Sequence, residues 1–208
     1  MKLIIFGATG TIGHHLVEQA LEQGHQVTAF ARHPSALGID HQNLTLFTGD
    51  VFNQASVDEA IKGNDAVLVT LGSAKLTGKV RSVGTGNIIK AMERHQVKRL
   101  ICQSTLGVGD SESNLNFVWK YLMFGLLLRF VFKDHVVQEE MVKQSHLDWT
   151  IVRPSAFTDE TLTGTIKYGS LPSDKKLMLK IPRLQVAKFM MQQLTDENYL
   201  YKTPAVTY

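Results

Sequence analysis

The stretch LIIFGATGTIG, residues 3–13, decides the fold. Four apolar residues of a strand are followed by glycines at positions 7, 10 and 13 and then by helical spacing of apolar residues. Gly7 permits a tight turn, Gly10 lets the backbone approach a pyrophosphate, and Gly13 lets the helix pack on the strand. The N–H groups and the dipole of a helix starting near Thr11 then face the anion. The alternative is a structural turn in an unrelated α/β domain, but the strand before and the helix after favour a dinucleotide-binding loop.

The strand–helix order continues along the first half of the chain. Apolar strands are expected at 25–31, 44–50, 65–72 and 98–104, and helices at 11–24, 56–63 and 84–97. Ser56 is the expected N-cap of its helix, with Glu59 completing a capping box. The strands do not alternate apolar with polar residues, which is typical of a parallel sheet buried on both faces. The sequence predicts a Rossmann-like, doubly wound parallel sheet with helices on both faces.

The second half has a different pattern. A long apolar helix is expected at 114–132, an amphipathic helix at 134–146, a strand at 148–154, a small hairpin from TIKYG (165–169) and KLMLKI (176–181), and a helix at 182–194. Pro182 suits the first turn of the last helix. Because no linker interrupts the chain, we expect one domain over 1–208, with a cofactor half (1–110) and a substrate-side half with a small C-terminal lobe (111–208).

Composition limits the class of protein. The chain has 208 residues, 44% of them hydrophobic, and a formal charge of +3, without a dense run of Lys or Arg that would bind nucleic acid. The longest apolar tract, 121–128, is shorter than the roughly 20 residues that span a bilayer. Cys102 is the single cysteine, which excludes an internal disulfide and favours a reducing compartment. We therefore expect a cytoplasmic protein with no nucleic-acid partner and no stable membrane insertion.

The end of the second predicted strand reads AFARHPS, and it predicts which dinucleotide is bound. An acidic residue there would bind the ribose hydroxyls, whereas a basic one accepts a 2′-phosphate. Arg32, with His33 beside it, predicts a preference for NADP(H) over NAD(H); the alternative is a solvated surface arginine. After the third strand, Asp50 and Val51 could contact adenine or simply form a turn.

Several motifs together resemble the atypical short-chain dehydrogenase/reductases. They are GATGTIG (7–13), AFARHP (29–34), TGDV (48–51), TLGS (70–73), NIIKAMERHQVKRLICQST (87–105) and DWTIVRPSAFTDETLTG (148–164). The pattern is most similar to the NAD(P)H-binding proteins of the biliverdin reductase B and flavin reductase type, and the last motif is the most specific. The resemblance implies a monomer or weak homodimer that passes a hydride from NADPH to a flat acceptor such as a flavin, quinone or tetrapyrrole.

The resemblance also implies the site residues. The cofactor would be held by Gly7, Thr9, Gly10, Thr11, Ile12, Gly13, Arg32, His33, Asp50, Val51, Leu71, Gly72, Ser104, Pro154 and Ser155. Two departures matter: Ala156 stands where the biliverdin reductase pattern has a histidine, and the arginine expected after Gly72 is missing, with Lys75 one residue late. These departures favour a flavin or quinone over biliverdin.

No usual catalytic acid is present. Short-chain dehydrogenases use a Tyr-x-x-x-Lys pair, and none of the five tyrosines has a lysine four residues later. The candidates are therefore Ser104 and Thr105, as hydrogen-bonding groups at the end of the fifth strand, and His135, which could carry a proton or serve only in packing. Cys102 lies in an apolar strand and is expected to be inert. No His, Cys or Asp cluster has metal-ligand spacing, so no metal is expected.

Three functions remain open at this point. The first is an NADPH-dependent reductase of a flavin or quinone. The second is a non-catalytic NADP(H)-binding sensor of the NmrA type, which the missing tyrosine–lysine pair favours. The third, a nucleotide-sugar epimerase-like enzyme, is disfavoured by the short chain. The aromatic tract 117–132 could roof a planar substrate, form an interface or pack on the sheet.

Overall fold

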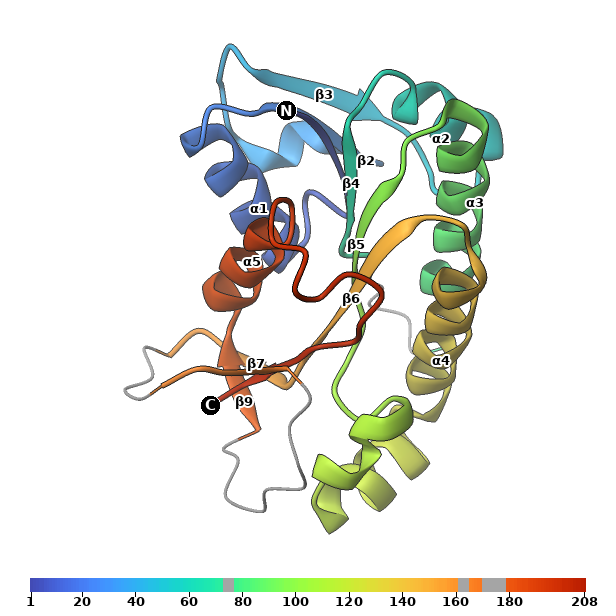
Figure 1. The fold of residues 1–208 in the computed structure, drawn as a ribbon, viewed down its shortest axis with the longest axis vertical. Coiled ribbons are helices and arrows are strands. Elements are labelled where there is room, and N and C mark those ends of the chain that lie inside the picture. Colours follow the sequence, from blue (N-terminus) through green and yellow to red (C-terminus); the bar gives the residue numbers. More distant parts are fainter. Residues whose placement is uncertain (73–76, 161–164, 170–178) are drawn as a thin grey trace.

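The computed structural model describes residues 1–72, 77–160, 165–169 and 179–208. Its main sheet has the strand order β3-β2-β1-β4-β5-β6-β10-β8, parallel except for β8 (Figure 1). The bounds are β1 Lys2–Phe6, β2 Gln26–Ala31, β3 Leu44–Thr48, β4 Ala66–Val69, β5 Arg99–Gln103, β6 Asp148–Pro154, β8 Lys167–Gly169 and β10 Ala205–Thr207. The chain runs outward from β1 to β3, returns to β4, and then runs outward to β6, so the predicted doubly wound sheet is confirmed.

Helices cover both faces of the sheet (Figure 1). The bounds are α1 Thr11–Glu22, α2 Gln54–Ile61, α3 Val80–His95, α4 Arg129–Gln144 and α5 Arg183–Gln192. Leu3 and Ile5 of β1 join the core under α1 and α5, whereas Ile4 and Phe6 join the core under α2, α3 and α4. Because successive side chains of a strand point to opposite faces, β1 is apolar at each of its four buried positions, 3–6.

The cap of α2 corrects one expectation. The helix begins at Gln54, and the side chain of Asn53 accepts hydrogen bonds from the N–H groups of Ala55 (3.1 Å) and Ser56 (3.3 Å). Ser56 is therefore in the first turn rather than at the N-cap. The reason is that asparagine caps a helix as well as serine does and stands earlier in the chain.

The predicted hairpin of 165–169 and 176–181 is wrong in its described part. β8 pairs antiparallel with β10, whereas the second segment contributes to β9 (Lys180–Pro182), which pairs in parallel with β7 (Ala156–Thr158). Three-residue strands carry little pairing specificity of their own, so the open edges of β10 and β7 decide their partners.

The apolar segment before α4 is more irregular than expected. A 3₁₀ turn, η2 (Gly109–Asn114), precedes a π-helical segment, η3 (Val118–Leu127), and α4 starts only two residues later. A separate 3₁₀ turn, η1 (Pro34–Leu37), lies between β2 and β3. The expected boundary at residue 133 is therefore wrong, because α4 already begins at Arg129. Within the described part of the chain, no helix is long and apolar enough to cross a membrane.

Candidate functional site

The carboxyl ends of the parallel strands place the site. Phe6 is in register with Phe30 and Val69, Val69 with Cys102, and Gln103 with Val152. The residues that leave these strands lie at the same edge of the sheet as a result. They are Gly7, Arg32, Thr70, Ser104 and Ser155. Doubly wound sheets bind ligands at this edge, on either side of the return from β3 to β4.

The phosphate loop, residues 7–13, has a backbone that glycine alone allows. Gly7 has a φ of +84°, and a Cβ there would lie 2.5 Å from the carbonyl oxygen of Thr70. A Cβ on Gly13 would overlap the carbonyl oxygen of Gly7. Gly10 precedes α1 without any side-chain cap, so the N–H groups of the first turn remain open to a ligand. Thr9, Gly10 and Thr11 are exposed and Ile12 is buried, and the cradle fits a pyrophosphate.

Arg183, which the sequence analysis missed, brings a cation to this loop. It comes from the start of α5, and its Nε donates to Thr11 Oγ1 at 3.2 Å. Its Nη1 pairs with Asp159 at 2.7 Å, and its guanidinium lies over the Phe157 ring. Because 171 residues separate Thr11 from Arg183 along the chain, no local pattern could have revealed the contact. A guanidinium beside a helix N-terminus suits an anionic ligand.

The adenosine side follows β2 and β3. Arg32 and His33 are exposed immediately after β2, and no acidic side chain in the described residues pairs with Arg32. Asp50 Oδ1 accepts from the N–H of Phe52 at 3.0 Å, which makes a turn. The buried Val51 accepts a hydrogen bond from an asparagine side chain of α3 at 2.8 Å. These contacts do not test binding, so the roles of all four residues stay predictions.

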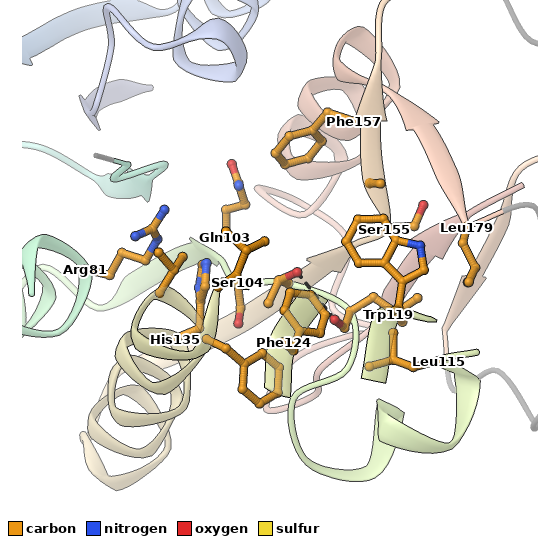
Figure 2. A pocket seen from close by; sticks show the side chains of 16 residues that line it. Arg81, Gln103, Ser104, Leu115, Trp119, Phe124, His135, Ser155, Phe157 and Leu179 are labelled. Atoms are coloured by element: carbon orange, nitrogen blue, oxygen red, sulfur yellow. Dashed lines mark hydrogen bonds between the residues drawn. The ribbon is translucent and has the colours of Figure 1, made fainter. Parts of the chain in front are cut away.

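A cavity of about 270 Å³, here called the edge pocket, opens beyond the ends of β5 and β6 (Figure 2). One wall is aromatic: Phe124 stacks on Phe132 at 4.7 Å, and Trp119 lies 5.6 Å from Phe124 between ring centres. The opposite side carries the polar groups of Arg81, Ser104 and His135. An apolar slot with a few polar groups on one side is suited to a flat ring system.

Three polar groups of the edge pocket lack protein partners. The Oγ atoms of Ser104 and Ser155 and the Nη1 of Arg81 are buried, with no hydrogen-bond partner among the described residues. Buried polar groups without partners are rare in folded proteins. These three groups border one cavity, where they are available to hydrogen-bond a ligand or a water molecule.

Arg81 is the second residue that the sequence analysis missed. Its Nη2 would lie 4.0 Å from a Cβ built on Gly72, so the guanidinium stands beside the exit of β4. Its Nη1 is 3.9 Å from Asp134 Oδ2, too far for a hydrogen bond. Burial lowers the pKa of Arg81, and the charge of Asp134 opposes this shift. Arg81 thus brings a cation to the exit of β4, whereas Lys75 lies outside the described residues.

His135 is buried in the wall of the edge pocket. Its Nδ1 lies 3.2 Å from Gln138 Oε1, while Gln138 Nε2 donates to Thr85 Oγ1 at 3.0 Å. The amide orientation therefore assigns the hydrogen of the ring to Nδ1. Burial, helped by the charge of Arg81, lowers the pKa of His135 to about 3. The ring is neutral at physiological pH, which suits a hydrogen-bonding role better than that of a charged acid. Thr105 is half-buried, and its Oγ1 lies 3.4 Å from the Leu106 carbonyl.

A buried ion pair lies beneath the edge pocket. Arg153 is 1% exposed, and its Nε and Nη2 donate to Glu139 at 2.9 and 2.7 Å. Asp110 and Lys143 extend the network at 2.5 Å from Arg153 and 3.0 Å from Glu139. Burial raises the pKa of Glu139. The hydrogen bonds and charge of Arg153, and to a smaller extent the hydroxyl of Ser104, lower this pKa by more than burial raises it, so the carboxylate is ionised. Ser104 therefore stands between a fixed negative charge and the edge pocket.

Two further predictions concern the cysteine and metals. Cys102 is buried in β5, and burial raises the pKa of its thiol, in agreement with an inert role. On α1, the Nδ1 atoms of His14 and His15 lie 3.3 and 3.2 Å from one oxygen of Glu18. These three half-exposed groups could hold an ion. That no metal is required stays a prediction.

A family profile described as NAD(P)H-binding matches residues 7–197, which include the phosphate loop and the edge pocket. The chain belongs to this NAD(P)H-binding family. The resemblance inferred from the motifs is thereby confirmed. The family match does not decide between NADP(H) and NAD(H).

The relatives of this NAD(P)H-binding chain include reductases. An isoflavone reductase homolog, A622, of Nicotiana tabacum is 36% identical over 222 residues, which cover 97% of this chain and 66% of that protein. The chain thus spans about two thirds of this relative's length. Two solved structures share the fold: a short-chain dehydrogenase/reductase of Veillonella parvula in complex with NADP (TM-score 0.83, 18% identity, 100% of this chain and 94% of that one) and ChuY, an anaerobilin reductase of Escherichia coli O157:H7 (TM-score 0.81, 23% identity, 100% and 97%).

Proposed function

We propose that the protein is an NADPH-dependent reductase that transfers a hydride to a planar acceptor, a flavin or a quinone, bound in the edge pocket. The observation that carries the proposal is the edge pocket itself (Figure 2). It is apolar and walled by aromatic rings, it adjoins the exits of β5 and β6, and Ser104, Ser155 and Arg81 bring polar atoms without protein partners to it. A binding protein without chemistry needs no second pocket of this kind.

The cofactor would be held along the carboxyl edge of the sheet. The phosphate loop and Arg183 would bind the pyrophosphate, and Arg32 with His33 would bind the 2′-phosphate that makes NADP(H) the preferred dinucleotide. Asp50 and Val51 would border adenine. At the other end, Leu71, Gly72, Pro154 and Ser155 would border the nicotinamide. When bound, the nicotinamide supplies the hydride.

The chain's own residues would position the acceptor. Trp119 and Phe124 would cover its ring and exclude water, while Ser104, Thr105 and Arg81 would donate hydrogen bonds to its carbonyl oxygens. Negative charge grows on such oxygens as the hydride arrives, and donors aimed at them lower the barrier. Because His135 is neutral, the proton that completes the reduction would come from water rather than from this ring.

The setting of the reaction is part of the same proposal. We infer a cytoplasmic monomer or weak homodimer without a nucleic-acid partner, supported by the single buried cysteine and the modest charge. We also infer a division into a cofactor half, residues 1–110, and a substrate-side half, residues 111–208. The edge pocket crosses that division, since Arg81 and Ser104 belong to the first half.

The experiment measures NADPH oxidation with FMN, FAD, a water-soluble quinone and biliverdin as acceptors. We expect turnover with a flavin or the quinone. The variant Phe124→Ala should raise the KM for the acceptor at least tenfold without changing NADPH affinity. Phe117→Ala is the matched control, because Phe117 is 76% exposed and does not line the edge pocket. NADPH binding without turnover of any acceptor would contradict the proposal and leave the sensor hypothesis.

A further inference from the structure

The segment from η3 to the start of α4 exposes many large apolar side chains. None of the residues of η3 is buried. The exposed apolar residues of this segment, here called the apolar tip, are Phe117, Val118, Tyr121, Leu122, Leu126, Leu127 and Phe130. Phe117 is 76% exposed and Leu126 60%. Contiguous apolar patches on a folded chain mark a surface that contacts a partner or a membrane.

The apolar tip projects from the molecule at the carboxyl end of the sheet (Figure 1). The same segment has a second face, from which Trp119, Phe124 and Leu128 line the edge pocket. One short helical segment therefore presents one side to the pocket and the other to the outside. Whatever covers the apolar tip is in contact with the wall of the edge pocket.

The charges within the segment that carries the apolar tip all have one sign. Residues 115–133 contain three basic side chains and no acidic one. Lys120 lies over the Tyr121 ring at 5.5 Å and Arg129 over the Phe130 ring at 4.6 Å, and Lys133 is exposed on the next turn of α4. Lys120 pairs with Glu112, which precedes the segment, but an exposed pair of this kind is weak.

This combination fits the surface of an anionic lipid bilayer. Aromatic and leucine side chains enter the boundary of the acyl chains, while lysine and arginine reach back to the phosphates. Each basic side chain near such a surface adds attraction to the anionic lipid. A second copy of the chain fits less well, because a two-fold interface would bring the cations of both copies together, and two projecting surfaces do not interlock.

We propose that the apolar tip docks on an anionic bilayer and that the edge pocket receives a lipid-soluble quinone from it. Docking follows from the surface alone, whereas the identity of the acceptor rests on the proposed function. The reaction balances as quinone, NADPH and one proton giving quinol and NADP⁺, with the proton taken from water. Docking would spare an apolar acceptor the passage through water between the bilayer and the edge pocket.

Co-sedimentation with vesicles tests the docking. The purified full chain is mixed with vesicles of phosphatidylcholine alone or with phosphatidylserine added. We expect binding to the anionic vesicles, at least tenfold weaker for Leu126→Ser combined with Phe130→Ser, and weaker for Arg129→Gln combined with Lys133→Gln. Leu46→Ser, an exposed leucine on β3 at the far end of the sheet, is the control and should bind as the parent does.

Unchanged NADPH affinity shows that the variants are folded. Absence of binding to the anionic vesicles, or equal binding by the Leu126→Ser and Phe130→Ser variant, would overturn the docking. So would a dimer in analytical ultracentrifugation that this variant converts to monomer while no vesicle binding is seen, because the apolar tip would then be a self-association surface.

Turnover with two quinones tests the access route. The variant that combines Leu126→Ser with Phe130→Ser should reduce a water-soluble quinone at the parent rate. It should reduce a long-chain quinone embedded in anionic vesicles at least tenfold more slowly than the parent does. Equal rates on the embedded quinone would overturn the route. If the parent binds vesicles but reduces neither quinone, the proposed function fails while the docking stands, so the two failures are distinguishable.

Discussion

The phosphate loop and the edge pocket lie at the same edge of the sheet, yet they are built in different ways. The loop is a run of seven consecutive residues that presents backbone N–H groups to a ligand, and its shape depends on Gly7 and Gly13. The edge pocket is assembled from side chains of α3, β5, η3, α4 and β7. A local motif therefore encodes the phosphate loop, whereas the edge pocket exists only when distant elements have packed.

The two regions also differ in how they are supported. The loop rests on backbone contacts with β4, because Gly7 lies against Thr70. The edge pocket rests on the buried charges of Arg153 and Glu139. Substitutions in the loop should therefore act first on cofactor binding, whereas substitutions under the pocket should act first on stability.

The largest effect on this comparison is expected from Gly13→Ala. The added Cβ would overlap the carbonyl oxygen of Gly7, which is backbone and cannot move away cheaply. We expect NADPH affinity to fall at least a hundredfold, measured by fluorescence titration. Gly63→Ala is the control: its φ of +77° would strain an alanine, but nothing lies within 4 Å of the added Cβ, so it should cost about 1 kcal/mol of stability and no affinity.

The support of the edge pocket is tested by Glu139→Gln. The change leaves the buried Arg153 with only the exposed Asp110 as counter-charge, and breaking a buried pair costs about 3–5 kcal/mol. Urea denaturation should show that loss in the free energy of unfolding. Asp58→Asn, which breaks an exposed pair with Arg94, should cost far less. Equal losses for the two variants would show that the buried pair has no special role.

The same ion pair makes the free energy of unfolding depend on pH in the acidic range. The pKa of Glu139 is lowered in the folded protein relative to 4.5, so its contribution is complete above that pH and is lost as the pH falls below it. In the Glu139→Gln variant, the free energy of unfolding should depend less on pH over this acidic window.

Cofactor choice is tested by Arg32→Asp. We expect the ratio of NADPH to NADH affinity to fall at least tenfold, because a carboxylate repels the 2′-phosphate that a guanidinium would bind. Stability should not change, since Arg32 is exposed. Lys90→Asp makes the same change of charge on α3 and should leave the ratio as it is. An unaltered ratio in Arg32→Asp would remove the basis for a preference for NADP(H).

Ser104→Ala tests the polar side of the edge pocket. Loss of one hydrogen bond to the acceptor should lower kcat about tenfold, which corresponds to about 1.4 kcal/mol. The free energy of unfolding should change by no more than about 1 kcal/mol, because the one polar contact of Ser104 Oγ with the protein, toward Glu139, does not reach ordinary hydrogen-bond geometry. Undiminished turnover with a flavin or quinone would count against a positioning role.

The last prediction concerns His135 and pH. Between about pH 6.5 and pH 3, the unfolded chain binds a proton at residue 135 that the folded protein does not. The free energy of unfolding should therefore fall as the pH falls, by up to about 1.4 kcal/mol per pH unit from this group. His135→Gln should flatten that slope, whereas His146→Gln, at an exposed histidine, should not. If the free energy of unfolding of the parent and of His135→Gln had the same dependence on pH, His135 would be accessible to protons in the folded protein.

The fold and one side of the site could be predicted because parallel strands end at one edge. The apolar strands revealed the doubly wound sheet, and Ser104 and Ser155 follow from where β5 and β6 stop. Arg183 could not be predicted, because its contact with Thr11 depends on how α5 packs on α1. Arg81 had a weaker signal: a cation at the start of the helix after the fourth strand.

The errors have the same physical origin. A three-residue strand such as β8 has no periodicity strong enough to choose a partner, and the edge of β10 chose it instead. The pair of Arg153 and Glu139 joins a strand to a helix, so the local sequence around either residue does not predict the pair. Sequence periodicity reports which face is buried, but it does not report which polar groups meet there.

The place of β10 in the sheet sets an order of events during synthesis. Residues 205–207 insert between β6 and β8, with Ala205 opposite Arg153, and Ser155 donates its N–H to Val206 at 3.0 Å. While a ribosome is still translating the last part of this sequence, β1 to β6 have already been made and can begin to pair. The outer edge of β6 stays bare until residues 205–207 emerge, so a nascent chain would need protection along that edge in the interval.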